Sequence, residues 1–281
     1  MMEIKCWGSR GSIPVSGKQY EKYGGDTTCI QITAQSGETI IVDGGTGIRR
    51  LGDALLEKNI TRYHLLFTHA HWDHILGLAF FRPMQFSKVE ILIQDRIFFD
   101  ISTQDVLNEV LKQPFFPIGV NDLNASLVFK KELNKKAFQI GSVKVETIPT
   151  SHPGGGLGYK FTENDTSFVF LTDNELGFNH PGGKQFDEYR LFCKNADLLI
   201  HDAEYTAQDY KKNISWGHSL YTDALDLAIK ANVKKLGLFH LNQNRSDEQM
   251  DEMVKLCTTE LKQKGVSMEC FAVASDMTFT L

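Results

Sequence analysis

The feature that most constrains the fold is the stretch LLFTHAHWDHIL at residues 65–76, where three histidines and an aspartate follow directly on an apolar run. A lone histidine in such a place is usually a core residue whose ring nitrogens are hydrogen-bonded. Four potential ligands within six positions, namely His69, His71, Asp73 and His74, are better explained by a metal site. The segment therefore predicts a metal centre with further ligands supplied elsewhere in the chain.

One metal ion does not easily take all four of these side chains, whereas two neighbouring ions can. Further ligands stand at or soon after apolar runs, as His152 in PTSHPGG, Asp173 in VFLTDNE and His240 in LGLFHLN. Taken singly, His152 is typical of a solvated loop and His240 of a core histidine. Imidazole and carboxylate together suit zinc, and they also accept manganese or iron. We therefore predict two divalent cations, the first held by His69, His71 and His152, the second by Asp73, His74 and His240, with Asp173 bridging them.

The alternation of short apolar runs and helical patterns favours an α/β layered fold. Strands are predicted at residues 39–42, 89–93, 143–147, 167–172, 197–200 and 235–239. Helices are predicted after the GGTG turn, from Leu220, and near the end of the chain, where Ser246 and Gln249 form a capping box. No linker or repeat divides the chain, so residues 1–281 are taken as a single domain whose strand-end loops carry the chemistry.

Composition and charge narrow the function. The chain is 42% hydrophobic and 23% charged, which is ordinary for a globular protein. Its formal charge of −5 offers no broad basic surface for a nucleic-acid backbone, so a small anionic substrate is favoured over RNA. The longest apolar run, ILGLAFF, is far shorter than the roughly 20 residues of a membrane helix, and we expect a cytoplasmic protein without a membrane partner. The five dispersed cysteines predict core residues rather than disulfides.

The motif HAHWDH, followed by single downstream ligands, resembles the metallo-β-lactamase-fold hydrolases over nearly the whole chain. The segments CWGSRGSIPVSG, IIVDGGTGIRRLG, LLIHDAEYT and FHLNQNRSDE look more narrowly like the branch that contains tRNase Z and small phosphodiesterases, including cyclic-nucleotide phosphodiesterases. The resemblance implies an αββα sandwich, with two mixed sheets flanked by helices and the metals at one edge. Zinc β-lactamases commonly carry a cysteine where Asp173 stands, which disfavours a lactamase.

The resemblance also implies catalytic roles. In tRNase Z-like enzymes an acid orients a histidine that protonates the leaving group; HDAE places Asp202 at the acid and WGHS supplies His218 as the histidine. A carboxylate can keep such an imidazole partly protonated. The alternative is that Asp202 caps a loop and that His218 caps or packs against the helix near Leu220. Asp73 is expected both to bind a metal and to help orient the nucleophile.

We therefore expect a binuclear metal-dependent hydrolase, above all a phosphodiesterase that cleaves small, cyclic-nucleotide-like phosphodiesters with a metal-bound hydroxide. A tRNase Z-like endoribonuclease is the first alternative, but tRNA-processing relatives carry a Gly/Pro-rich arm, and residues 94–140 are instead helix-like, aromatic and charged. A carboxylic ester, thioester or lactone hydrolase is a further alternative, as is a non-catalytic metal-dependent binding module. A homodimer is expected, with the aromatic segment 97–116 available to cover a partner.

Other residues and loops near these motifs could have a functional or a purely structural role. Arg10 is well shaped for phosphate oxygens, and a solvated surface arginine is the alternative. The glycine-rich loops 8–12 and 44–47 could present N–H groups to phosphate, but tight turns are favoured. Asp43 ends a strand and could orient a ligand histidine. The remaining histidines are expected outside the chemistry: His64 and His180 as structural or solvent-facing residues, and His201 pointing away from Asp202.

Overall fold

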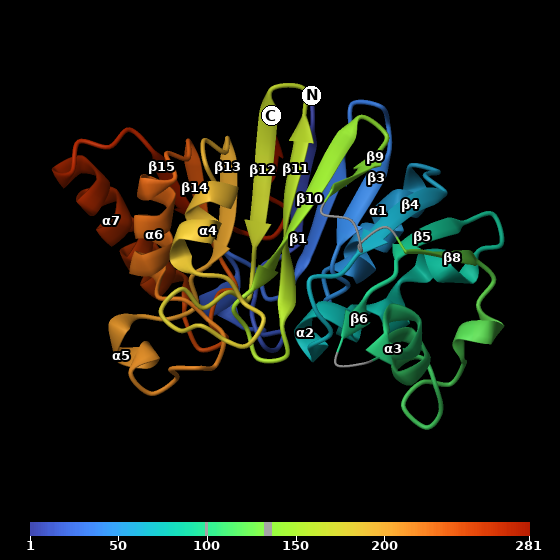
Figure 1. Ribbon diagram of the computed structural model, residues 1–281. Helices are drawn as coiled ribbons and strands as arrows, with labels where there is room; N and C mark the ends of the chain where they lie inside the picture. Colours follow the sequence, from blue (N-terminus) through green and yellow to red (C-terminus); the bar gives the residue numbers. More distant parts are fainter. Residues whose placement is uncertain (99–100, 132–136) are drawn as a thin grey trace.

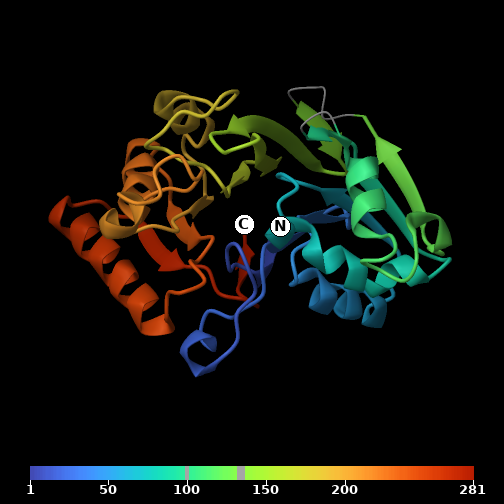
Figure 2. The same ribbon diagram turned by 90° about the horizontal axis from the view of Figure 1, so that it is seen from below.

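Two seven-stranded mixed sheets pack face to face, and helices cover the outer face of each (Figure 1). This computed structural model describes residues 1–98, 101–131 and 137–281. Seen from below, the helices lie on the two outer sides of the molecule with the sheets between them (Figure 2). The predicted αββα sandwich is therefore confirmed.

The first sheet has the strand order β16-β1-β2-β3-β4-β5-β8. Its strands are β1 (Glu3–Gly8), β2 (Cys29–Thr33), β3 (Thr39–Val42), β4 (Arg62–Leu66), β5 (Glu90–Gln94), β8 (Ser126–Lys130) and β16 (Thr278–Thr280). Strands β3, β4, β5 and β8 run parallel, so the chain returns through crossovers on the outer face. These crossovers contain α1 (Ile48–Glu57), α2 (Trp72–Ile75), the 3₁₀ turns Leu76–Phe80, Arg82–Gln85 and Val120–Asp122, the short strands β6 (Ile97–Phe98) and β7 (Ile101–Ser102), and α3 (Thr103–Val110). A further 3₁₀ turn, Lys18–Tyr20, lies between β1 and β2.

The second sheet has the order β15-β14-β13-β12-β11-β10-β9. Its strands are β9 (Ala137–Ile140), β10 (Val143–Thr150), β11 (Gly156–Glu163), β12 (Thr166–Leu171), β13 (Leu198–Asp202), β14 (Lys235–Phe239) and β15 (Glu269–Ala272). Strands β12 to β15 are parallel, and β10 runs in the same direction because two antiparallel pairings separate it from β12. Helices α4 (Phe186–Phe192), α5 (Ala207–Tyr210), α6 (Tyr221–Lys230) and α7 (Asp247–Gln263) occur in the connections of this sheet.

The core between the sheets joins aliphatic side chains of the first sheet to aromatic side chains of the second. It includes Ile4, Ile30, Ile40, Phe161, Phe168 and Phe170, all fully buried. Each such side chain contributes about 1.5–3 kcal/mol through burial of apolar surface. A separate apolar cluster fixes α1 and α3 to the first sheet, and another fixes α4, α6 and α7 to the second. The sheets therefore form a rigid frame whose strand ends hold fixed positions.

Strand ends of both sheets meet at one edge of the sandwich, the lower edge in Figure 1. The chain leaves β3 at Asp43, β12 just before Asp173 and β14 at His240. Likewise β4 ends shortly before His69, and β10 ends shortly before His152. The predicted ligands His69, His152, Asp173 and His240 therefore follow strands at this edge, while Asp73 and His74 lie in α2 and Asp202 is the last residue of β13.

The sequence predictions of single elements have mixed outcomes. The strands at 39–42 and 235–239 have the predicted bounds, and Ser246 forms the predicted capping box with Gln249. The expectation of a helix-like stretch over 94–140 is wrong outside α3 (Thr103–Val110), because residues 126–130 pair in parallel with β5 and residues 137–140 pair with β10. Residues 99–100 and 132–136 of that stretch lie outside the described residues.

Several compositional predictions have structural outcomes. All five cysteines are buried and free, as core residues should be. None of the helices in the described parts of the chain has the length and apolarity that a membrane crossing needs.

Both predictions for Arg10, a phosphate contact or a solvated surface position, are wrong. Its side chain is fully buried and donates to the backbone carbonyl oxygens of Gly24 at 2.9 Å, Asn242 at 3.2 Å and Arg245 at 3.1 Å. It therefore neither faces a phosphate nor lies in solvent. The guanidinium instead ties the N-terminal loop to the segment that follows His240, because these carbonyl groups have no strand partners to bind.

We expect Arg10→Ala to lower the free energy of unfolding by about 2–4 kcal/mol, because the partly buried carbonyl groups of Gly24 and Arg245 lose the guanidinium donor and a cavity is left. Thermal unfolding followed by circular dichroism measures the effect. Arg62→Ala is the matched control, since the Arg62 side chain is 61% exposed and pairs with Glu90 at the surface. Equal melting temperatures for the two variants would contradict the structural role of Arg10.

Candidate metal centre

The residues of the HAHWDH motif are placed by the end of a buried strand and the start of a short helix. Strand β4 ends at Leu66, and α2 begins at Trp72 with His71 as its extended N-cap residue. Asp73 and His74 fall in the first turn of α2 and are buried. The motif therefore bends at His71, which lets one short segment face two neighbouring groups of ligands.

Three residues at this edge adopt the left-handed backbone conformation directly after strands. The φ angles are 64° for Asp43, 51° for Asp173 and 56° for His240. This conformation costs of order 1–3 kcal/mol for a residue with a side chain, and it persists only where the surroundings enforce it. Its occurrence at several strand ends of one edge is typical of a functional site.

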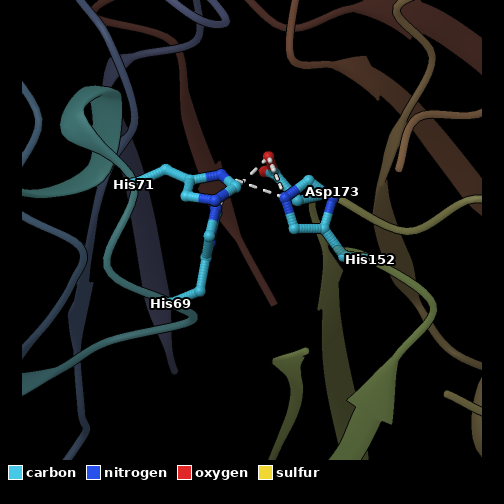
Figure 3. A group of neighbouring side chains, drawn as sticks. All are labelled: His69, His71, His152 and Asp173. Carbon is cyan, nitrogen blue, oxygen red and sulfur yellow. Dashed lines mark hydrogen bonds and ion pairs between the residues drawn. The ribbon is translucent and has the colours of Figure 1, made fainter. Parts of the chain in front are cut away.

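The first group of side chains is formed by His69, His71, His152 and Asp173 (Figure 3). One ligand atom from each lies within 4.8 Å of the others. The Nε2 atom of His152 is 3.1 Å from Nδ1 of His71, and Oδ1 of Asp173 is 3.6 Å from Nε2 of His69. The structure thus brings together the side chains that the sequence assigned to the first cation and to the bridge.

The second group contains Asp73, His74, Asp173 and His240. Oδ2 of Asp73 is 3.1 Å from Nε2 of His240 and 3.3 Å from Nε2 of His74. Asp173 belongs to both groups, since its Oδ2 is 3.2 Å from Nε2 of His74 while its Oδ1 faces His69. The carboxylate of Asp173 therefore lies between the two groups, as a bridging ligand would.

The spacing and chemistry of these atoms fit divalent cations. Tetrahedral coordination with bonds of about 2.0–2.1 Å separates neighbouring ligand atoms by roughly 3.3 Å, close to the separations given above. Among the described residues, Nε2 of His69 is buried without a hydrogen-bond partner. Buried polar atoms are normally satisfied, so this nitrogen indicates an absent binding partner. Imidazole and carboxylate donors suit zinc, manganese or iron.

The second ring nitrogens of the histidines are held by the protein. Asp43 Oδ2 lies 2.9 Å from Nδ1 of His74, as expected for a residue that orients a ligand. Glu204 Oε2 lies 2.8 Å from Nδ1 of His240, and the carbonyl oxygen of Gly217 lies 3.0 Å from Nδ1 of His152. These partners leave Nε2 of each ring directed into the centre.

The sequence analysis did not predict two residues, Glu204 and Thr68, that help to hold the ligand histidines. Glu204 lies in the HDAE segment, two positions after Asp202, and its role depends on contact with the distant His240. Thr68 precedes the motif, donates its hydroxyl to Asp43 and lies within 3.3 Å of Nδ1 of His74. A polar residue immediately before HAHWDH was the available signal for Thr68.

The glycine-rich loops pack against the site instead of presenting a phosphate cradle. In the loop 8–12, the N–H of Ser12 donates to Oδ2 of Asp73 at 2.8 Å. A Cβ atom on Gly11 would lie 2.2 Å from Nδ1 of His240, so only glycine fits there. In the loop 44–47, the N–H of Gly44 donates to the carbonyl of His74 at 2.6 Å. These contacts favour the prediction that both loops are tight turns over the prediction that they bind phosphate.

His218 and Asp202 form a close pair beside the second group. Nδ1 of His218 is 2.7 Å from Oδ2 of Asp202, and its ring stacks on His240 with centroids 4.5 Å apart. The other oxygen of Asp202 accepts from the N–H of Ser219 at 3.0 Å, so Asp202 also caps a loop. Burial opposes protonation of His218, but the carboxylates of Glu204 and Asp202 outweigh it and raise its pKa to about 9. The imidazole is therefore charged at neutral pH in this arrangement.

The charge states of the two groups differ. Burial lowers the pKa of His69 well below its usual value and that of His152 to about 3, so both rings are neutral. Burial disfavours ionisation of Asp73 and Asp173, but the neighbouring imidazoles of His74 and His240 hold the pKa of both carboxyls well below the usual range. The first group therefore offers neutral imidazole nitrogens, and Asp73 and Asp173 offer ionised oxygens, the forms that bind cations. In the second group the carboxylates raise the pKa of His74 and His240, so these two rings would lose a proton when a cation binds.

The remaining histidines lie outside both groups. His180 is buried and donates to Glu175 at 2.9 Å, which agrees with a structural role. The Nδ1 of His201 is 2.7 Å from the backbone oxygen of Asp202, and its Nε2 is 3.2 Å from the side-chain nitrogen of Asn174. His64 is half-buried on β4.

A cavity of about 380 Å³ opens directly onto these residues. It is lined by Ser12, Ala70, His71, Trp72, Asp73, Asp173, His218 and His240. A bound molecule would therefore contact residues of both groups and His218 at once.

We expect Gly11→Ala to weaken the binding of one of two divalent cations by about 10- to 100-fold, because the added methyl group displaces His240. Calorimetric titration of the chelator-treated protein with zinc measures the effect. Gly119→Ala is the control, since its Cβ would meet nothing closer than 3.5 Å. Unchanged zinc affinity in Gly11→Ala would contradict the placement of His240.

Comparison with known proteins places the chain in a family. A model of the beta-lactamase superfamily domain matches residues 38–241. The ribonuclease Z of Thermococcus sibiricus is 27% identical, over 92% of this chain and 92% of its own. The ribonuclease Z of Thermococcus gammatolerans is 30% identical, over 79% of this chain and 81% of its own.

Solved structures agree with this placement. The metallo-beta-lactamase fold protein YhfI from Bacillus subtilis superposes with a TM-score of 0.70 at 17% identity, over 99% of this chain and 98% of its own. A diphosphatase from the PhnP family superposes with a TM-score of 0.67 at 17% identity, over 100% of this chain and 98% of its own. The chain therefore belongs to the beta-lactamase superfamily, in the branch that contains ribonuclease Z.

Proposed function

We propose that this protein is a metal-dependent phosphodiesterase that hydrolyses small organic phosphodiesters, with cyclic nucleotides as the leading substrate class. The observation that carries the proposal is that His218 lines the same cavity as members of the two ligand groups. A phosphodiester in this cavity would contact both the cation ligands and a proton donor.

The first cation would be held by His69, His71 and His152, the second by Asp73, His74 and His240, with Asp173 between them. When bound, such a pair of cations lowers the pKa of water and stabilises negative charge on phosphate oxygens. Oδ2 of Asp73 also accepts the N–H of Ser12, which fixes the carboxylate at the cavity wall. Asp73 would then help orient the attacking oxygen.

His218 would act as the general acid. Because Nδ1 is bound by Asp202, Nε2 is the nitrogen that can donate to the leaving oxygen. As the bond between phosphorus and the leaving oxygen breaks, the proton passes from Nε2 to that oxygen and the product alcohol forms. Asp202 stabilises the imidazolium before the transfer. General acid catalysis of this kind contributes typically about 10²- to 10⁴-fold in rate.

The surroundings of the cavity support a small substrate with an aromatic part. Trp72 is 64% exposed and lines both the cavity and an apolar groove of about 360 Å³ beside it. The groove is lined mainly by apolar side chains, including Ile75, Ile101, Val106, Val110 and Phe115. An exposed indole is a stacking surface for a nucleobase. We propose that the base of a cyclic nucleotide occupies this groove while its phosphate lies at the ligand groups.

Endoribonuclease activity on tRNA precursors is the second candidate. The observation in its favour is the similarity to ribonuclease Z over most of the chain. The net charge of −5 weighs against it, because a polymeric substrate requires neutralisation of many phosphates. The same cations and the same acid, His218, would serve both reactions.

We expect His218→Ala to reduce kcat about 10²- to 10⁴-fold on phosphodiesters with alkyl leaving groups, and much less on bis(p-nitrophenyl) phosphate. The reason is that p-nitrophenolate departs without a proton. Steady-state rates with both substrate types, for zinc- or manganese-loaded and chelator-treated protein, measure the effect. An equal loss on both substrates would contradict the acid role, and undiminished activity after chelation would contradict the proposed function.

We expect Trp72→Ala to raise KM for a cyclic nucleotide roughly 5- to 150-fold, since stacking on one base contributes about 1–3 kcal/mol. KM for dimethyl phosphate, which has no ring to stack, should stay the same, and Trp72→Phe should restore most of the loss because it keeps an aromatic face. Incubating the wild type with a cyclic-nucleotide panel and with pre-tRNA completes the test. Cleavage of pre-tRNA alone would favour the ribonuclease candidate.

A further inference from the structure

Glu175 is a buried carboxylate two residues after Asp173, and its side chain is only 1% exposed. Among the described residues, four donors bind it. Oε1 accepts from the hydroxyl of Tyr210 at 2.7 Å and from the N–H of Ser215 at 2.9 Å. Oε2 accepts from the N–H of Gly217 at 2.8 Å and faces Nε2 of His180 at 2.9 Å. Each carboxylate oxygen thus accepts a different main-chain N–H of the segment 215–217, from Ser215 and from Gly217.

The segment 215–217 has a backbone that must be held. Ser215 has a φ of 70° and Gly217 a φ of 94°, both in the left-handed region. Serine rarely adopts this conformation without support from its surroundings. A Cβ atom on Gly217 would lie 1.9 Å from Nδ1 of His152, so the segment lies directly against that ring. The two N–H groups bound by Glu175 belong to Ser215 and Gly217, on either side of Trp216.

The backbone of Gly217 connects Glu175 to both halves of the site. Its N–H is bound by Glu175, and its carbonyl oxygen lies 3.0 Å from Nδ1 of His152. The next residue is His218, whose Nδ1 is held by Asp202. A shift of this one residue would therefore move the partner of a predicted cation ligand and the main chain of the predicted acid together.

We infer that Glu175 is a positioning residue that sets the placement of His152 and His218 at the same time, through the segment 215–217. The inference rests on the proposed function for the role of His218 as an acid, whereas the effect on His152 does not depend on it. Glu175 touches neither substrate nor cation in this account. It acts because its carboxylate accepts the main-chain N–H groups of both Ser215 and Gly217.

A glutamine at this position is the sharpest probe. Tyr210 and His180 can each turn to accept a hydrogen bond, but the N–H groups of Ser215 and Gly217 cannot. Either orientation of the amide places its NH₂ group against one of these N–H groups, because each carboxylate oxygen binds one of them. Glu175→Gln therefore releases one end of the segment while keeping the shape of the side chain.

Glu163→Gln is the matched control. Glu163 is also buried, with 2% exposure, and its carboxylate accepts the N–H of Gln35 at 2.9 Å and the hydroxyl of Ser142. It lies at the end of β11, a strand that runs away from the site edge. Both variants should lower the melting temperature to a similar extent, so stability alone does not separate them.

We expect Glu175→Gln to reduce kcat at least 10-fold on alkyl phosphodiesters and less than 3-fold on bis(p-nitrophenyl) phosphate, with KM changed less than 3-fold. It should also weaken the binding of one of the two zinc ions about 10-fold. Loss of a residue that hydrogen-bonds to a ligand histidine typically lowers metal affinity about 10- to 100-fold. Glu163→Gln should show neither change. Steady-state kinetics and calorimetric zinc titration measure the two effects.

Equal kinetic and zinc-binding profiles for the two variants would overturn the inference. If the wild type hydrolyses no phosphodiester, the proposed function fails, and the zinc titration still decides: weaker binding in Glu175→Gln than in Glu163→Gln supports the placement of His152, and equal binding overturns it. If Glu175→Gln does not fold, Tyr210→Phe removes one donor and should give a smaller loss with the same preference for alkyl substrates. No such preference in that variant would also overturn the inference.

Discussion

The structure is organised around the buried carboxylate of Asp173, which lies between two groups of imidazoles at one edge of the sandwich. A buried carboxylate without partners costs several kcal/mol, so this arrangement is stable only with positive charge beside it. In the described residues that charge comes from His74 and His240, whose pKa values rise well above the usual range because nearby carboxylates outweigh burial. Divalent cations would take over the same role, and the neutral rings of His69 and His152 are ready to bind them.

Each group draws side chains from both sheets, so the distances between ligands depend on how the sheets pack. His69 and His71 follow a strand of the first sheet, while His152 and Asp173 follow strands of the second. The aliphatic and aromatic core between the sheets fixes their separation. The supports act more locally: Asp43, Glu204 and the Gly217 peptide each bind one histidine ring. The core thus sets the position of the loops, and the hydrogen bonds set the orientation of each ring.

The sequence predicted the fold class and the grouping of side chains because HAHWDH concentrates ligands in six positions and the other ligands follow apolar strands. It did not predict strands such as β1 and β11, whose segments EIKCWG and GLGYKFTE mix polar residues and glycines with apolar ones. Nor did it predict Glu204, Glu175 or the burial of Arg10. Glu204 contacts His240, 36 positions away, and Glu175 binds Gly217, 42 positions away. Arg10 donates to Asn242, 232 positions away, and only the folded chain brings such residues together. Local patterns thus identify ligands more readily than the residues that orient them.

The central claim is that two cations occupy the two groups and share Asp173. Anomalous diffraction from crystals of the zinc-loaded protein, recorded on both sides of the zinc absorption edge, tests it most directly. The account predicts two peaks, one within bonding distance of His69, His71 and His152 and one within bonding distance of Asp73, His74 and His240, with Asp173 reaching both. A single peak, or peaks remote from His152 and His240, would contradict it.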